Sequence, residues 1–147
     1  MNPNLIYLVQ TDTTVGFSSI NDEKLSNIKK RDINQKILKT VDSFTTLKEF
    51  TRVPKNFKRL VRLSIKTTFI YPNLNSFRVI SKDSSFHSFI KKFKILSSTS
   101  ANKTKNSYEY DFAIDNSDIE VVEKNGLFET SSSKIYRLYK KRLRRMR

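Results

Sequence analysis

Two short polar segments stand where predicted buried strands end, and their side chains are of kinds that bind phosphate groups. Residues 10–14 follow the apolar run of residues 5–9, and residues 98–102 follow a strand predicted over residues 94–97. Ligands of α/β sheets usually bind at such strand ends. Short hydroxyl and amide groups, with nearby backbone N–H groups, can hold a phosphate or a ribose there. Taken singly, the first segment also fits a β-turn with a helix cap, and the second fits a polar loop.

Three cations are candidates to meet an anionic ligand. Lys29 and Arg31 end a helix predicted over residues 20–31 and can supply fixed positive charge, and the guanidinium fork of arginine suits bidentate phosphate contact. A Lys-Lys-Arg run seen alone is more often a solvated helix end. Arg78 lies in a strand predicted over residues 76–80, where it could be an ordinary strand-face charge.

Composition excludes several other kinds of site. The chain has no cysteine, which excludes disulfides and thiol-based catalysis or metal binding. His87 is the only histidine, and its apolar neighbours favour a surface or core-edge position over a metal site or a catalytic triad.

The 147 residues carry a formal net charge of +15. Such a field attracts polyanions and speeds their capture. The alternative is a solubility surface in a Lys-rich proteome, since the Lys- and Asn-rich, Gly- and Pro-poor composition could reflect nucleotide bias. The basic segment 134–147 contains no acid and fits either a helix or strands, whereas residues 107–123 are acidic and are expected to fold back on the basic body or to form a solvated edge.

The remaining pattern alternates strands and helices and predicts the elements that must position these side chains. Further strands are predicted over residues 35–41, 67–71 and 119–122, and further helices over residues 43–50, 56–63 and 84–93. We therefore expect an α/β fold: a single domain over residues 1–147, with a twisted mixed parallel and antiparallel sheet and flanking helices. The N-terminus lacks the features of a signal peptide and no apolar run is long enough to span a membrane, which predicts a cytoplasmic protein without membrane contact.

Two motifs in this order resemble the YrdC-like family. Residues 10–16, QTDTTVG, resemble that family's P-T-D/E-T-V-Y/F-G element, and residues 98–102, STSAN, match its S-x-S-A-N element completely. Residues 29–31 match its K-x-R element, and residues 77–79 resemble its A-V-R-V/I strand. Weaker matches place Thr68, Ser133 and Arg145 on family positions, with Arg142 or Arg144 in place of Arg145 after a small slip.

The chain also departs from the family pattern. Gln10 and Val15 replace a proline and an aromatic residue, and Ile65 and Lys66 replace the glycine and proline before Thr68. The chain is shorter than typical members. These losses relax loop geometry around the predicted site.

The resemblance implies an L-threonylcarbamoyladenylate synthase, which joins threonine, bicarbonate and ATP with release of pyrophosphate for transfer RNA modification. It would make residues 134–147 a pair of short strands. ATP would arrive with Mg²⁺, and no covalent nucleophile is required, because Lys29 and Arg31 would stabilise charge. The implied contacts to ATP are Lys29, Arg31, Thr68, Ser98, Ser100, Asn102 and Arg145, and those to threonine are Thr11, Thr13, Arg78 and Ser133.

The alternative function is a non-catalytic RNA- or nucleotide-binding protein on the same fold. The basic surface would bind transfer RNA or another RNA, and other transfer RNA modification proteins would be partners. Tyr136 and Tyr139 could stack on bases, although sequence-neutral electrostatics is the safer expectation.

Overall fold

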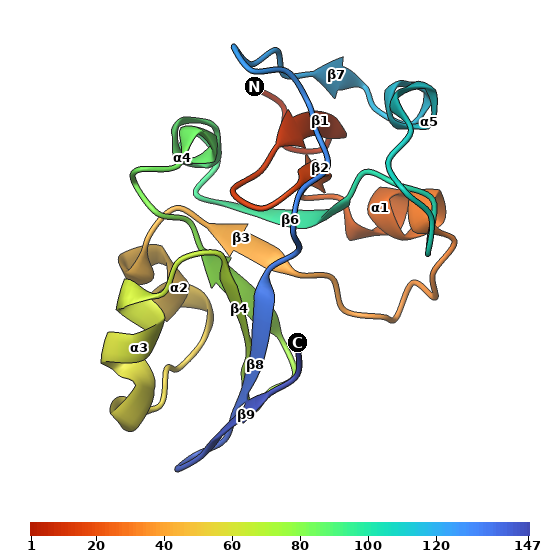
Figure 1. Ribbon diagram of the computed structural model, residues 1–147. Coiled ribbons are helices and arrows are strands. Elements are labelled where there is room, and N and C mark those ends of the chain that lie inside the picture. Colours follow the sequence, from red (N-terminus) through yellow and green to blue (C-terminus); the bar gives the residue numbers. More distant parts are fainter.

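The computed structural model describes residues 1–147 as one α/β unit built on a twisted sheet (Figure 1). The sheet has nine strands in the order β7-β1-β2-β6-β3-β5-β4-β8-β9. Three neighbouring pairs are parallel (β1 with β7, β3 with β5, β4 with β8) and the others are antiparallel. The strands are β1 Tyr7–Gln10, β2 Val15–Ser19, β3 Lys39–Val41, β4 Thr67–Ile70, β5 Ser76–Val79, β6 Ile95–Ser100, β7 Ile119–Glu120, β8 Lys134–Leu138 and β9 Leu143–Arg145.

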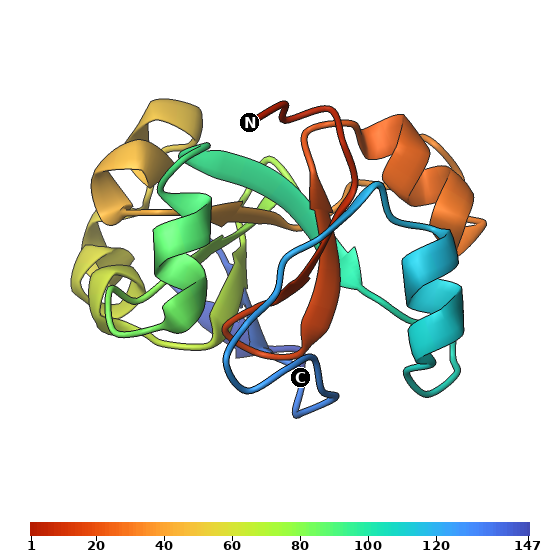
Figure 2. The ribbon, with the colours of Figure 1, turned by 90° about the horizontal axis from the view of Figure 1, so that it is seen from above.

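Five helices and one 3₁₀ turn cover the sheet. They are α1 Asp22–Lys29, α2 Phe44–Phe50, the 3₁₀ turn Lys55–Phe57, α3 Lys58–Leu63, α4 Ser85–Ile90 and α5 Tyr110–Asp115. Figure 2 shows α1 and α5 together at one end of the molecule, α2 and α3 at the other, and α4 between them. The prediction of a mixed sheet with flanking helices is confirmed. No helix is both long enough and apolar enough to cross a membrane.

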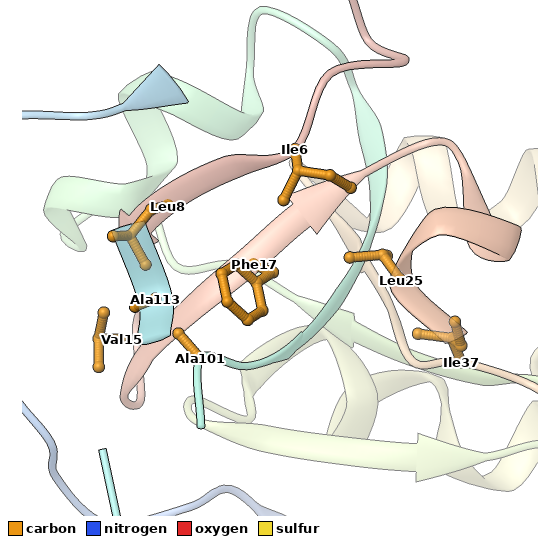
Figure 3. Close-up of a cluster of buried hydrophobic side chains, with 8 residues drawn as sticks. All are labelled: Ile6, Leu8, Val15, Phe17, Leu25, Ile37, Ala101 and Ala113. Atoms are coloured by element: carbon orange, nitrogen blue, oxygen red, sulfur yellow. The ribbon is translucent and has the colours of Figure 1, made fainter. Parts of the chain in front are cut away.

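Alternate side chains of β1 and the residue before it pack against helices on opposite faces of the sheet. Ile6 and Leu8 pack with Leu25 of α1 and Ala113 of α5, in the cluster drawn in Figure 3. The intervening Tyr7 and Val9 pack in a second cluster that holds the apolar face of α4: Phe86, Phe89 and Ile90. Successive strand residues point to opposite faces, so a strand buried on both sides reads as one apolar run.

In the other half of the sheet, helices pack against one face only. Phe69 of β4 and Phe77 of β5 pack with α2 and α3 through Leu47 and Val61. Their neighbours along the strands, among them Thr68 and Arg78, point to the opposite face. The face without helices carries polar side chains, and these line the candidate site.

The tail forms a strand pair, as the family resemblance implied: β8 and β9 make a hairpin on the sheet edge. Two elements were missed. β2 was not predicted, because its sequence VGFSS has little strand propensity; pairing with β1 and β6 on its two sides imposes the strand. In the acidic segment, Ala113 and Phe112 of α5 pack against the core, so this part folds back rather than forming only a solvated edge.

Candidate functional site

A cavity of about 300 Å³ opens on the sheet face without helices. Its walls come from the β1–β2 turn, the loop after α1, strands β4, β5 and β6, the segment before β8 and the C-terminal residue. Of 17 lining residues, three are hydrophobic. Those that matter below are Thr11, Thr13, Gly16, Arg31, Thr68, Arg78, Ser98, Ser100, Ser133 and Arg147.

The β1–β2 turn is held closed by its own hydroxyl groups. Thr11 Oγ1 donates to the Thr14 carbonyl at 2.6 Å and accepts from the Thr13 backbone N–H at 3.2 Å. Thr13 Oγ1 lies 3.3 Å from Thr11 Oγ1. Thr11 therefore has the turn-forming role that such residues favour, while Thr13 keeps most of its hydrogen-bonding capacity for the cavity.

Gly16 lets β2 approach β6 closely. It pairs with Ser100 across the two strands, and Ser18 pairs with Ser98. A Cβ atom on Gly16 would lie 2.9 Å from the Thr99 carbonyl oxygen and 3.1 Å from Thr11 Cγ2. Only glycine fits between the turn and the β6 backbone, so this residue sets the position of the β6 hydroxyl groups in the cavity wall.

The Lys29 ammonium is engaged inside the protein. It donates to the carbonyl oxygens of Ser100 and Asn102, at 3.0 and 2.5 Å, and to Asn102 Oδ1 at 2.9 Å. Burial, with the nearby Arg31 charge, lowers the pKa of Lys29 to about 8. Lys29 thus fixes the backbone at the end of β6 and does not line the cavity.

Arg31 reaches the cavity because the chain turns sharply after α1. Lys30 adopts a left-handed conformation with φ of 51°. Its N–H donates to the Asn27 carbonyl and that of Arg31 donates to the Ser26 carbonyl, a Schellman-type helix end. The side chains of Lys29 and Arg31 therefore point to different places. Lys29 holds the end of β6, whereas the guanidinium of Arg31 lies at the cavity and makes no hydrogen bond or ion pair within the protein.

Arg78 is paired with a buried carboxylate. Its Nη2 lies 3.0 Å from Asp12 Oδ1, and both side chains are almost fully buried, with 4% and 3% of their surfaces exposed. Burial raises the pKa of Asp12 and lowers the pKa of Arg78, each opposed by the attraction of the partner charge. Arg78 Nε has no partner within the protein, although it is buried. Arg78 also lines the cavity, where the positive charge of its guanidinium suits an incoming oxyanion.

A polar chain continues from Arg78 across β4 and β8. Arg78 Nη1 lies 3.5 Å from Thr68 Oγ1, which is 2.9 Å from Ser133 Oγ. Arg147 Nε donates to the Ser133 carbonyl at 3.0 Å. The cavity therefore has two small hydroxyl groups between two guanidinium groups.

The charges of the lining residues favour an anionic ligand. It includes three arginines, Arg31, Arg78 and Arg147, and no acidic residue. The only carboxylate in contact with one of these arginines is Asp12, which lies behind Arg78. A second cavity of about 210 Å³ adjoins the first through Thr14, Ser100 and Ser132, and Asn102 lines it. No group of three or more His, Asp or Glu side chains comes together as a metal site.

The structure brings most of the predicted site residues together. Those that line the main cavity are Thr11, Thr13, Arg31, Thr68, Arg78, Ser98, Ser100 and Ser133. Lys29 and Asn102 lie beside it and bond each other. Arg145 is exposed on β9 and lines neither cavity, whereas Arg147, which sequence reasoning missed, lines the main one. The strand period could not have found it, because Arg145 pairs with Tyr136, which points away from the cavity. The N–H groups of Met146 and Arg147 both donate to the Ile135 carbonyl, and this bulge places Arg147 opposite Ile135 on the cavity side.

The sequence matches no protein-family model and no curated protein. Similar solved structures nevertheless cover 98% of the chain. E. coli YciO aligns with a TM-score of 0.75 and 13% identity over 82% of its own chain. P. abyssi Sua5 in complex with L-threonine aligns with a TM-score of 0.75 and 13% identity over 50% of its chain, and full-length HypF in a phosphate- and nucleotide-bound form with 0.72 and 14% over 27%. The chain thus spans half the length of that Sua5 and less of HypF.

At this identity the likeness concerns the fold. It agrees with the sequence motifs, most of whose predicted site residues line one cavity. We conclude that this chain has the YrdC-like fold, which it shares with YciO and with parts of Sua5 and HypF.

Proposed function

We propose that the cavity binds ATP and L-threonine and that the protein forms L-threonylcarbamoyl-AMP for transfer RNA modification. The observation that carries this proposal is the joint placement of Arg31 and Arg78, one free of protein partners and one held by Asp12, around the β4 and β6 hydroxyl groups. The Sua5 structure with bound L-threonine and the nucleotide-bound HypF structure support it as neighbours of the same fold.

In the proposed reaction, the amino group of threonine takes up bicarbonate and loses water, which leaves a carbamate. A carbamate oxygen then attacks the α-phosphorus of ATP, the P–O bond to the β-phosphate breaks, and pyrophosphate leaves. Threonine, bicarbonate and ATP thus give threonylcarbamoyl-AMP, pyrophosphate and water. This chemistry requires placement and charge neutralisation, and no covalent protein nucleophile.

The nucleotide part of the proposal rests on Arg31. Its guanidinium can take two phosphate oxygens at once, because no protein group occupies it. Ser98, Ser100 and Thr68 supply short hydroxyl groups to phosphate or ribose, and Asn102 lines the adjoining cavity. We assign Arg147 the role expected of Arg145. Mg²⁺ would be carried on the ATP phosphates, as is usual for this ion.

The amino-acid part rests on Arg78. A threonine carboxylate bound in the cavity would lie beside the guanidinium of Arg78, which is one of the lining residues. Thr13 and Ser133 would hydrogen-bond the substrate's polar groups. Asp12 holds the guanidinium in place from behind, so the arginine need not reorganise when the ligand binds.

Lys29 has a supporting role in this scheme. The three oxygens that its ammonium binds are the Ser100 carbonyl and the backbone and side-chain oxygens of Asn102, so it fixes the strand end that carries the β6 hydroxyls. Lys29→Ala is expected to lower activity by loosening β6, and Arg31→Gln by removing a ligand contact.

The test is pyrophosphate release by the purified protein with ATP, L-threonine and bicarbonate. We expect release that requires all three substrates and that falls sharply in Arg31→Gln but not in Arg145→Gln, a matched substitution outside the cavity. Absence of release at high protein concentration, together with no stabilisation by ATP or AMP, would refute the proposal.

One observation favours a non-catalytic nucleotide-binding protein as the second candidate. Because Lys29 is engaged with Ser100 and Asn102, Arg31 is the only cation of the Lys-x-Arg element at the cavity. Such a protein would be stabilised by AMP, since a ligand stabilises the fold that binds it, and would release no pyrophosphate.

A further inference from the structure

Another concave surface, separate from the two adjoining cavities of the candidate site, lies at the end of the molecule that carries α2 and α3. It is a groove of about 650 Å³ between three segments: the linker from α2 to the 3₁₀ turn, the β4–β5 turn and the tip of the β8–β9 hairpin. Figure 1 shows the hairpin projecting beyond the sheet on the side of α3. The lining residues are Thr51, Arg52, Pro54, Lys55, Asn56, Pro72, Asn73, Lys140 and Lys141.

The charge of this groove has one sign. Arg52, Lys55, Lys140 and Lys141 are exposed, and none forms an ion pair. No acidic residue lines the groove. Four cations in a concavity focus a positive potential and raise the local concentration of anions.

The hairpin tip is a fixed support for its two lysines. Leu138 is fully buried, and Tyr139 N–H donates to the Arg142 carbonyl at 2.9 Å, which closes the turn. The Tyr139 ring lies under two guanidinium groups, 5.3 Å from Arg137 Cζ and 4.4 Å from Arg142 Cζ. Lys140 and Lys141 therefore project from an ordered turn rather than from a loose end.

The lining points to an extended polyanion. Lysine ammonium groups act as point charges, and the only buried polar residue in the lining is Thr51, so the groove offers little that would orient a small ligand. None of its lining residues carries a large hydrophobic side chain that could insert among lipid tails. A phosphodiester backbone fits a groove that presents spaced cations and no specific donor pattern.

We propose that this groove binds the phosphate backbone of RNA. The choice of RNA rests on the proposed function, whose product is used on transfer RNA; the phosphate chemistry rests on the groove alone. Binding is sequence-independent, because the tyrosines once expected to stack on bases are occupied: Tyr136 stacks on Phe69, and Tyr139 lies between two arginines.

The test compares two triple variants of equal charge. Lys55, Lys140 and Lys141 are replaced by glutamine in the groove variant, and the exposed Lys82, Lys91 and Lys92 in the control variant. Binding of a fluorescent RNA duplex is measured by anisotropy over a range of salt concentrations. Loss of three phosphate contacts lowers the slope of log K against log salt by about 2.7, so a rise from about 50 to 200 mM salt weakens the wild type about 40-fold more than the groove variant.

The slope of log K against log salt for the control variant is expected to differ from that of the wild type by no more than about 0.9, the change that one phosphate contact makes. Equal slopes in the two variants would overturn the proposal. Tighter binding of a DNA duplex of the same sequence would overturn the assignment to RNA, and tighter binding to vesicles of phosphatidylcholine and phosphatidylserine would identify a membrane surface. Neither variant changes a residue of the cavity, so pyrophosphate release from both tests the proposed enzyme activity separately.

Discussion

Replacing one partner of the buried Asp12–Arg78 pair should destabilise the fold more than replacing both. At a separation of 3.0 Å the attraction is about 5.5 kcal/mol with an effective dielectric constant of about 20. The pKa directions show that burial opposes both charged forms more strongly than the partner charge supports them. The pair therefore adds little net stability, although a lone buried charge costs about 3–5 kcal/mol.

The assay is a double-mutant cycle by urea unfolding at neutral pH, followed by circular dichroism because the chain has no tryptophan. We expect Asp12→Asn and Arg78→Met each to cost about 3–5 kcal/mol, and the double variant to cost no more than the worse single change. The coupling energy is then about 3 kcal/mol or more. Additive effects of the two single changes, which mean a coupling energy near zero, would show that the two charges do not compensate each other.

The double variant also separates stability from ligand binding. Saturating L-threonine, at about 100 times its dissociation constant, stabilises a binding-competent fold by about 2.7 kcal/mol, or about 5–10 °C in Tm for a chain of this size. We expect this shift in the wild type and none in the folded double variant. A full shift without Arg78 would show that Arg78 does not bind the carboxylate.

Three further predictions follow from single contacts. Gly16→Ala is expected to cost about 1–3 kcal/mol, because its Cβ would meet the Thr99 carbonyl at 2.9 Å; Gly126→Asn, at a φ of 73° with nothing within 4 Å, should cost less in the same thermal melt. The pKa of Lys29 falls from 10.5 to about 8 on folding, so the unfolded chain binds more protons between these two pH values. The unfolding free energy of the wild type should therefore rise relative to that of Lys29→Met as the pH goes from 8 to 10. A constant difference between the two unfolding free energies would contradict this shift. Arg31→Gln should weaken AMP binding in calorimetry without lowering Tm, since its guanidinium has no protein partner, and Arg145→Gln should change neither.

The elements that sequence reasoning found are those whose own side chains carry the signal. Residues 7–9 are buried on both faces and read as an apolar run, and Ser43 caps the predicted helix α2 by accepting from the Thr46 N–H. β2 carried no such signal, because its strand conformation comes from pairing with β1 and β6. The acidic residues of α5 concealed a short apolar face made by Phe112 and Ala113.

The candidate site divides in the same way. Ordered motifs marked Ser98, Ser100, Thr68 and Ser133 as site residues. The strand predicted to end at residue 97 continues to Ser100, however, so Ser98 and Ser100 belong to β6 itself. The orientation of the cations could not be read from sequence, since it depends on the left-handed Lys30, which sends Lys29 to the β6 backbone and Arg31 to the cavity. Arg147 was missed because the tail offers several arginines, and only the β8–β9 register decides which one reaches Ser133.

The measurement that tests the central claim most directly is mass spectrometry of the product formed from ATP, L-threonine and isotope-labelled bicarbonate. We expect a threonylcarbamoyl adenylate that carries the label and appears with an equal amount of pyrophosphate. We also expect Arg31→Gln to form little of this product. Pyrophosphate without the labelled adenylate, or no product from a protein that binds both ATP and L-threonine, would contradict the account.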